Sequence, residues 1–170
     1  ELITKFNVQK IPALIISKDI LDYTSITQIW NQLNATEKQG FYALHSTVPP
    51  YRDLATKKLE GLVSVVYLKD DSCTNCYDVH VNRQILQRRL VITNETNADI
   101  NSDYGKGLLK NYNITKVPII LVSPEANAYE GFVQVWPQVG NVSSDGWFGM
   151  RKPEVLGAYR DLSTGQIISP

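Results

Sequence analysis

The clearest hydrophobic pattern in this chain is an almost unbroken apolar run at residues 62–68, which is rich in β-branched side chains. A run of this length that is apolar on both faces is typical of a central β-strand covered by helices. Polar residues follow directly, and we expect a helix over residues 73–87. Its start can be capped by Asp70, Asp71 or Ser72, whose side chains suit the positive end of a helix.

The rest of the second half divides into alternating elements. We expect strands at residues 89–93, 118–122 and 132–136, a loop at residues 94–101, and a helix that Ser102 or Asp103 caps and that reaches Tyr112. Gly105 and Gly107 weaken that helix. The order strand, helix, strand, helix, strand, strand predicts an α/β domain.

An internal repeat organises the chain. The segment that begins at Leu2 matches the segment that begins at Leu108, and the offset between them stays constant as far as Gly40 and Gly146. The matched pairs include Pro12 with Pro118, Trp30 with Trp136 and, after a slip of two positions, residues 51–54 with residues 159–162. Self-similarity over this length indicates duplication of a whole structural unit.

The two copies of the repeat are unequal, because the segment that precedes the second copy has no equivalent before the first. We therefore expect residues 1–58 to form the C-terminal half of a unit, and residues 59–170 to form a complete domain that ends in a hairpin turning at Thr164-Gly165. Two strand candidates and a short helix cannot cover both faces of a sheet. We expect the first segment to dock against the complete domain or to pair with another chain, as in a homodimer formed by exchange between two copies.

Composition excludes some function classes. The chain has 170 residues and 43% hydrophobic residues, which suits a globular protein that buries a core. Seventeen basic and seventeen acidic residues create no broad field that would attract nucleic acid or an anionic membrane. No apolar run approaches the roughly 18 residues that cross a bilayer. Loops rich in Asn, Ser and Thr, together with the tandem organisation, favour an extracytoplasmic location.

The candidate chemistry lies in Cys73-Thr74-Asn75-Cys76, which contains both cysteines of the chain. Cys-x-x-Cys that follows a strand and opens a helix is the spacing of a redox-active dithiol. A cysteine in the first helical turn has its thiolate stabilised by free backbone N–H groups, which can lower the thiol pKa from about 8.5 into a range of roughly 3.5 to 7.5. Cys73 is therefore the expected attacking thiol, and Cys76, one turn further on, is the resolving thiol.

Residues 61–140 resemble the thioredoxin-like family. The resemblance rests on Val66-Tyr67-Leu68 before the Cys-x-x-Cys motif and on Val117-Pro118 before the second apolar strand. It implies a central mixed sheet flanked by helices, preceded here by the C-terminal half of a second such unit. It also implies a cis proline at position 118 that faces the dithiol, with Pro12 as its counterpart in the first copy.

The resemblance further implies that the protein exchanges disulfides with protein or peptide substrates and needs no organic cofactor. Val117 and Pro118 would pair with an extended substrate peptide, and Thr74 and Asn75, between the cysteines, would contact it. These two residues differ from those of the well-known family members, and Ser72 replaces the usual aromatic residue. The direction of electron transfer therefore does not follow from the resemblance.

His80 has more than one interpretation. If a helix began at Cys73, His80 would share a face with both cysteines, which would permit a metal site with His45 as a fourth ligand. Alternatively, His80 is a partly buried helix residue that adjusts the thiol pKa values. A cysteine-protease arrangement of one cysteine with either histidine is a third possibility. The interpretation as a partly buried helix residue is favoured over the metal site, and the pair of cysteines makes a protease arrangement unnecessary.

Two function classes remain open. The favoured class is a thiol-disulfide oxidoreductase that acts through Cys73 and Cys76. The alternative is a non-catalytic binding or scaffold protein with a thioredoxin-like fold, in which the cysteine pair is a structural disulfide or a metal site. The first copy of the repeat lacks the motif, which favours the alternative slightly because not every unit carries thiols.

Overall fold

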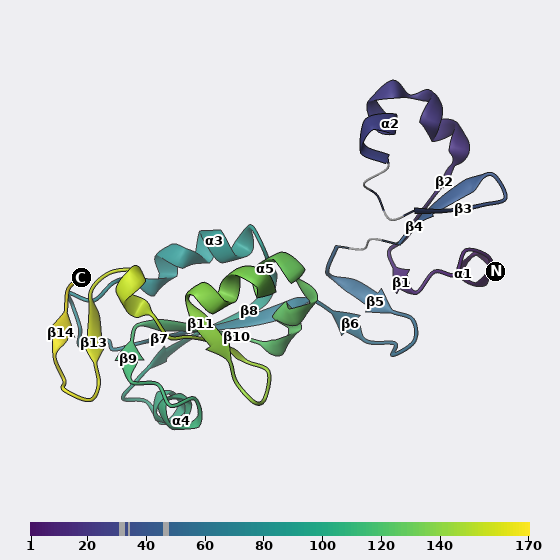
Figure 1. Ribbon diagram of the computed structural model, residues 1–170. Helices are drawn as coiled ribbons and strands as arrows, with labels where there is room; N and C mark the ends of the chain where they lie inside the picture. Colours follow the sequence, from purple (N-terminus) through teal and green to yellow (C-terminus); the bar gives the residue numbers. More distant parts are fainter. Residues whose placement is uncertain (31–32, 34, 46–47) are drawn as a thin grey trace. The chain divides into compact units, whose positions relative to one another are not determined.

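The computed structural model describes residues 1–30, 33, 35–45 and 48–170, and the chain divides into two compact units, Glu1–Glu60 and Gly61–Pro170 (Figure 1). We call them unit 1 and unit 2. Both contain helices and strands, so the predicted α/β class is confirmed. No helix among the described residues is long and apolar enough to cross a membrane.

Unit 2 is built on a five-stranded mixed sheet. Its strands, in spatial order, are β11 (Gly140–Val142), β12 (Phe148–Met150), β10 (Ile119–Val122), β7 (Leu62–Lys69) and β8 (Val91–Asp99). The pair β7–β8 is parallel, and the other pairs are antiparallel. Strand β7 lies inside the sheet and is mostly buried, which explains its continuous apolar sequence.

Helices cover both faces of this sheet. In Figure 1, α3 (Arg83–Gln87) and α5 (Glu130–Val135) lie on one side and α4 (Asp103–Asn111) on the other. Short 3₁₀ turns complete the unit; they are η2 (Val79–Asn82), η3 (Pro124–Ala128), η4 (Trp136–Gln138) and η5 (Pro153–Val155). A second small sheet joins β9 (Lys116–Val117), β13 (Tyr159–Asp161) and β14 (Ile167–Ile168), and the predicted hairpin at Thr164-Gly165 is confirmed by the β13–β14 pair.

One strand prediction and one loop prediction in unit 2 were wrong. Residues 132–136, expected as a strand, belong to α5 and η4; Phe132 and Trp136 are one helical turn apart, and their ring centroids lie 5.0 Å from each other. The loop expected at residues 94–101 is mostly strand, because β8 continues to Asp99. Its polar side chains occupy an outer strand, where backbone pairing with β7 holds residues of low strand propensity.

Unit 1 contains smaller elements. These are α1 (Leu2–Lys5), β1 (Lys10–Ile11), β2 (Leu14–Ser17), η1 (Lys18–Asp22), α2 (Thr24–Trp30), β3 (Ala35–Lys38), β4 (Phe41–Leu44), β5 (Tyr51–Asp53) and β6 (Leu59–Glu60). They form two three-stranded sheets, with orders β2-β4-β3 and β1-β5-β6. Among the described residues of this unit, only Phe6 and Ala43 are buried apolar residues. Unit 1 therefore has a very small core.

The internal repeat is matched element by element. When unit 1 is shifted by the offset that aligns Leu2 with Leu108, the bounds of η1 coincide with those of η3, β2 overlies β10, and α2 overlies α5 together with the start of η4. The bonds before Pro12 and Pro118 are both cis, as the resemblance implied. Asn7 and Asn113 both adopt positive φ, at 52° and 49°. Strands β7 and β8 and helix α3 have no counterpart among the described residues of unit 1.

Candidate functional site

The two cysteines form a disulfide at the end of β7, with an S–S distance of 2.02 Å. They line a cavity of about 150 Å³ together with Pro118, Asp70 and Tyr77. The structure therefore brings Cys73, Cys76 and Pro118 to one place, although Pro118 is far from both cysteines in the sequence.

The predicted helix start at Cys73 was wrong. Helical structure begins only at Val79, and the segment between β7 and that residue consists of turns and bends. In a helix, the N–H of Tyr77 would donate to the carbonyl of Cys73, but here it donates to the carbonyl of Ala158 at 2.7 Å. The side chain of Asp78 caps η2 by accepting from the N–H of His80, so the turn starts after the dithiol.

Because no helix begins at Cys73, a helix dipole does not stabilise a thiolate there. The two cysteines also differ in exposure: Cys73 is almost buried, with 9% of its surface exposed, whereas Cys76 is half-buried. A partner that approaches from solvent therefore meets Cys76 more readily than Cys73. Thr74 and Asn75 are exposed and form the tip of the loop between them.

Val117 lies beside the site but is fully buried. It belongs to β9 and is paired with Arg160 of β13, so one edge of its backbone is already in a sheet. Pro118 lines the cavity next to the cysteines. Of the residues assigned to substrate contact, Pro118 has the most direct access to the dithiol cavity.

A buried ion pair lies beneath the cysteine loop. The side chain of Asp70 has no exposed surface, and its carboxylate lies 2.6 Å from the guanidinium of Arg160, whose side chain is 25% exposed. The other carboxylate oxygen of Asp70 accepts from the N–H of Ser72 at 2.8 Å and from its hydroxyl at 2.6 Å. The N–H of Cys73 donates to the carbonyl of Asp70 at 3.0 Å. Asp70 therefore holds the loop that carries Cys73 instead of capping a helix.

Sequence reasoning missed Arg160. It lies in the repeated Tyr-Arg-Asp segment, whose counterpart in unit 1 is Arg52. The guanidinium of Arg52 donates to the carbonyl of Lys57, whereas that of Arg160 reaches Asp70 and, at 3.3 Å, the hydroxyl of Ser72. The repeat did contain a signal for this arginine. In both units, it places an arginine on the strand that pairs with the residue before the cis proline.

Both ring nitrogens of His80 already have hydrogen-bond partners. Its Nδ1 atom lies 2.8 Å from the carboxylate of Asp78, and its Nε2 atom lies 2.6 Å from the side-chain oxygen of Asn97. The hydrogen bond with His80 lowers the pKa of Asp78. The imidazole also packs against the ring of Tyr67, with centroids 4.9 Å apart. Across the described part of the chain, no three His, Cys, Asp or Glu side chains are grouped as metal ligands.

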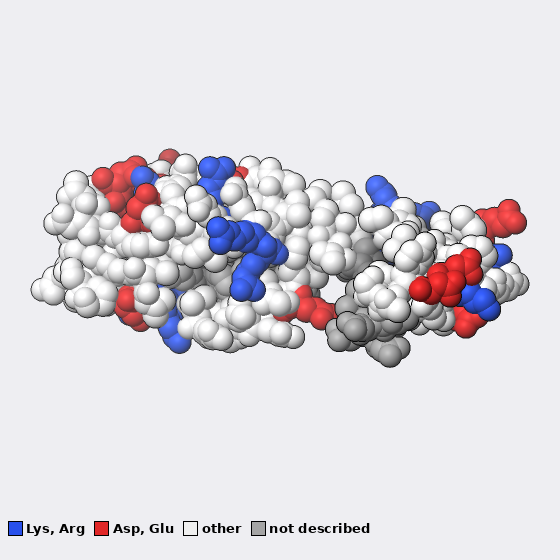
Figure 2. Space-filling view, turned by 90° about the horizontal axis from the view of Figure 1, so that it is seen from above, with Lys and Arg blue, Asp and Glu red and all other residues white. Residues whose placement is uncertain are grey.

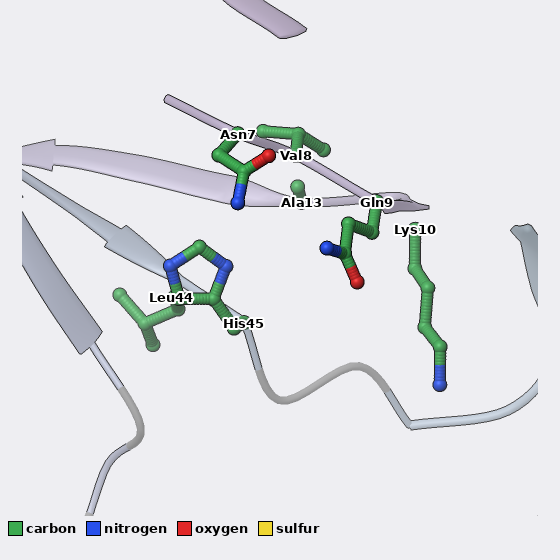
Figure 3. A pocket seen from close by; sticks show the side chains of 7 residues that line it. All are labelled: Asn7, Val8, Gln9, Lys10, Ala13, Leu44 and His45. Atoms are coloured by element: carbon green, nitrogen blue, oxygen red, sulfur yellow. The ribbon is translucent and has the colours of Figure 1, made fainter. Parts of the chain in front are cut away.

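One polar cavity recurs at equivalent positions of the two units. The cavity in unit 1 has a volume of about 350 Å³ (Figure 3), and the one in unit 2 a volume of about 190 Å³. The residues that line the two cavities correspond one to one in the alignment of the repeat. In unit 2, the guanidinium of Arg151 donates to the carbonyl of Tyr112 at 2.7 Å. His45 replaces that arginine in unit 1 and instead contacts the hydroxyl of Thr36.

Figure 2 shows small groups of basic and acidic residues separated by uncharged surface on the face that it displays.

The comparison with known proteins adds no assignment: no protein family model, no curated protein and no solved structure matches this chain. The chemistry must therefore be argued from the site itself.

Proposed function

We propose that this protein is a thiol-disulfide oxidoreductase with a thioredoxin-like unit 2, and that it exchanges electrons with protein or peptide partners through Cys73 and Cys76. The observation that carries the proposal is the juxtaposition of the cysteine pair with Pro118 around one cavity. A partly exposed disulfide at the rim of a cavity is open to attack by a partner thiolate.

The reaction proceeds in two exchange steps. In the reduced protein, the Cys76 thiolate attacks one sulfur of the partner disulfide, the partner's S–S bond breaks, and the released partner thiolate takes up a proton. The Cys73 thiolate then attacks the Cys76 sulfur, which closes the intramolecular disulfide and releases the second partner thiol. Two protein thiols are oxidised and one partner disulfide is reduced, and the reverse sequence oxidises a partner dithiol.

The exposure difference supports this order of attack. The sulfur that first contacts a partner must be accessible, and Cys76 is the more exposed residue of the pair. This reverses the order expected from a helix start at Cys73, since that helix start is lacking. Ser72, the residue before Cys73, is bound by Arg160 and Asp70, and these contacts would hold the loop that carries Cys73 during exchange.

The test uses the full chain and two single variants. Wild type is expected to accelerate the reduction of insulin by dithiothreitol, and Cys73→Ser and Cys76→Ser are both expected to be inactive in this assay. Cys73→Ser, which retains the attacking thiol, should accumulate a mixed disulfide with a partner peptide, whereas Cys76→Ser should accumulate little. If wild type and both variants reduced insulin at the same rate, the cysteine pair would be a structural disulfide and the proposal would be overturned.

A further inference from the structure

We infer that unit 2 binds a small aryl carboxylate, meaning a phenyl ring joined to a carboxylate by a short alkyl chain, in an apolar cavity between α3 and α5. The two helices lie on the same side of the sheet (Figure 1). Between them lies a cavity of about 180 Å³, with Ile120 of β10 among the residues that line it. All the described residues that line it belong to unit 2, so the cavity is formed by unit 2 alone.

The interior of the cavity is apolar and aromatic. Leu86 of α3, Phe132 of α5 and Trp136 at the end of that helix line it, and each of them is buried. An apolar cavity of roughly 150 Å³ stays dry and can hold a benzene ring. The cavity of unit 2 therefore has room for one such ring, with the rest of the ligand at the mouth. The ring centroids of Phe132 and Trp136 lie 5.0 Å apart, and both rings offer a surface on which a ligand ring can stack.

Most polar groups around the cavity are already engaged. The side-chain amide of Asn82 donates to the carbonyl of Val79 at 3.4 Å, and the indole N–H of Trp136 donates to the carbonyl of Asn141 at 3.2 Å. Arg89 differs, because in the part of the chain that the structure describes its guanidinium has neither a hydrogen-bond nor an ion-pair partner. None of the described residues that line the cavity is acidic. A cation without a counterion therefore lies at an apolar cavity, and an anionic group would complement it.

Arg89 lies where the cavity opens to solvent. It lines the cavity and is itself exposed, as are Ile85 of α3 and Val135 of α5, which are 56% and 41% exposed. A ligand can therefore enter between the two helices and keep its charged end at the rim. There a guanidinium can bind a carboxylate through two parallel N–H donors, and the apolar surroundings strengthen this interaction relative to water.

Each half of the ligand matches one feature of the site. A neutral aromatic compound would leave the Arg89 guanidinium without a partner, and a small anion without a ring would leave the apolar interior empty. Burial of the ring contributes affinity through the hydrophobic effect, and the carboxylate fixes its orientation. Neither Cys73 nor Cys76 lines the cavity, so the inference goes beyond the proposed redox function.

The test is an NMR titration of the full-length protein with isotope-labelled methyl groups of Ile and Val, at about pH 7, where the carboxylate of the ligand is ionised. Phenylpropionate should shift the methyl signals of Ile85, Ile120 and Val135 in a saturable manner, with a Kd below about 1 mM. Phenylpropanol, in which a hydroxyl replaces the carboxylate, should bind about tenfold more weakly. Propionate, which lacks the ring, should cause no saturable shift at about 10 mM.

Protein variants provide the matched controls. Arg89→Gln should weaken phenylpropionate binding about tenfold and change phenylpropanol binding by less than about twofold, because the alcohol carries no charge. Arg88→Gln removes an exposed cation that does not line the cavity, and both ligands should bind to this variant as to wild type. The double variant Cys73→Ser/Cys76→Ser should also bind like wild type, so failure of the redox proposal would leave this result unaffected.

The inference is overturned if phenylpropionate shows no saturable binding with a Kd below about 1 mM, or if the shifted methyl groups lie away from the cavity. It is also overturned if phenylpropanol binds as tightly as phenylpropionate, since the cavity would then be an apolar docking surface that requires no charge. Equal effects of Arg89→Gln and Arg88→Gln on phenylpropionate binding would show that Arg89 is not the partner of the carboxylate, and would overturn the inference as well.

Discussion

The substitution Arg160→Gln tests the ion pair beneath the cysteine loop. It leaves the carboxylate of Asp70 without its cation in a place where the side chain has no exposed surface. Removing one partner of a buried ion pair costs about 3 to 5 kcal/mol. Since a quarter of the Arg160 side chain is exposed, water can partly replace it, and we expect the free energy of unfolding of unit 2 to fall by about 3 kcal/mol, the low end of that range.

The assay is urea unfolding followed by tryptophan fluorescence in a Trp30→Phe background, so that the signal comes from Trp136 and Trp147 in unit 2. At about 4 °C per kcal/mol for a unit of this size, the same loss lowers the melting temperature of unit 2 by roughly 12 °C. The double variant Asp70→Asn/Arg160→Gln should recover part of the loss, because no unpaired charge then remains buried.

Arg83→Gln is the matched control in the same unit. The guanidinium of Arg83 lies 2.8 Å from the carboxylate of Glu95, but the Arg83 side chain is 55% exposed. An exposed ion pair contributes only about 0 to 1 kcal/mol. The reasoning fails if Arg160→Gln and Arg83→Gln lower the stability of unit 2 by the same amount, or if the double variant is no more stable than Arg160→Gln.

Two further predictions concern α4 and its end. Gly105→Ala should lower the free energy of unfolding by about 2 kcal/mol or more, because a Cβ atom would lie 1.9 Å from the carbonyl oxygen of Asp99. Gly107→Ala, whose Cβ would meet nothing within 4 Å, should instead raise it by about 1 kcal/mol. Urea unfolding compares the two variants, and equal effects would contradict the close approach at Gly105. Burial, followed by the hydrogen bond to Asp145, raises the pKa of Tyr112 to about 12. Because the folded pKa lies above the unfolded one, its contribution to stability is complete below about pH 10 and is lost as the pH rises toward 12; Tyr112→Phe should flatten this part of the pH profile, and an unchanged profile would contradict the assignment.

Much of the fold could be predicted because the responsible signals are local. The continuous apolar run identified β7, and Ser102 marked the start of α4, where its hydroxyl accepts from the N–H of Gly105 at 3.0 Å. The repeat placed Pro12 and Pro118 in equivalent positions. These features depend on residues close in sequence or on direct self-similarity, so one chain suffices to recognise them.

The errors arose where distant contacts override local preference. The segment after Cys73 is not helical because the N–H of Tyr77 is bound by Ala158, which belongs to a distant part of the sequence near β13. Strand β8 extends through a polar stretch because β7 pairs with it along its length. Because Ala158 and β7 are distant in sequence from the segments that they bind, the local sequence of those segments does not predict either contact.

The residues around the disulfide could be predicted, whereas the residues that support the cysteine loop were missed. Cys73, Cys76 and Pro118 could be named from spacing and resemblance, and the structure brings them together. Arg160 could not be assigned, because its role depends on how β13 is placed beside the cysteine loop. The sequence predicted Asp70 only as a candidate helix cap, whereas its carboxylate is buried against Arg160.

A redox titration of Cys73 and Cys76 tests the central claim most directly. The full-length protein is equilibrated in glutathione and dithiothreitol buffers of stepped potential, and free thiols are counted by alkylation and mass spectrometry. We expect one two-electron transition with a midpoint between roughly −270 and −120 mV, the range of proteins that exchange disulfides. A disulfide that stays oxidised below about −300 mV, as structural disulfides do, would contradict the proposed function.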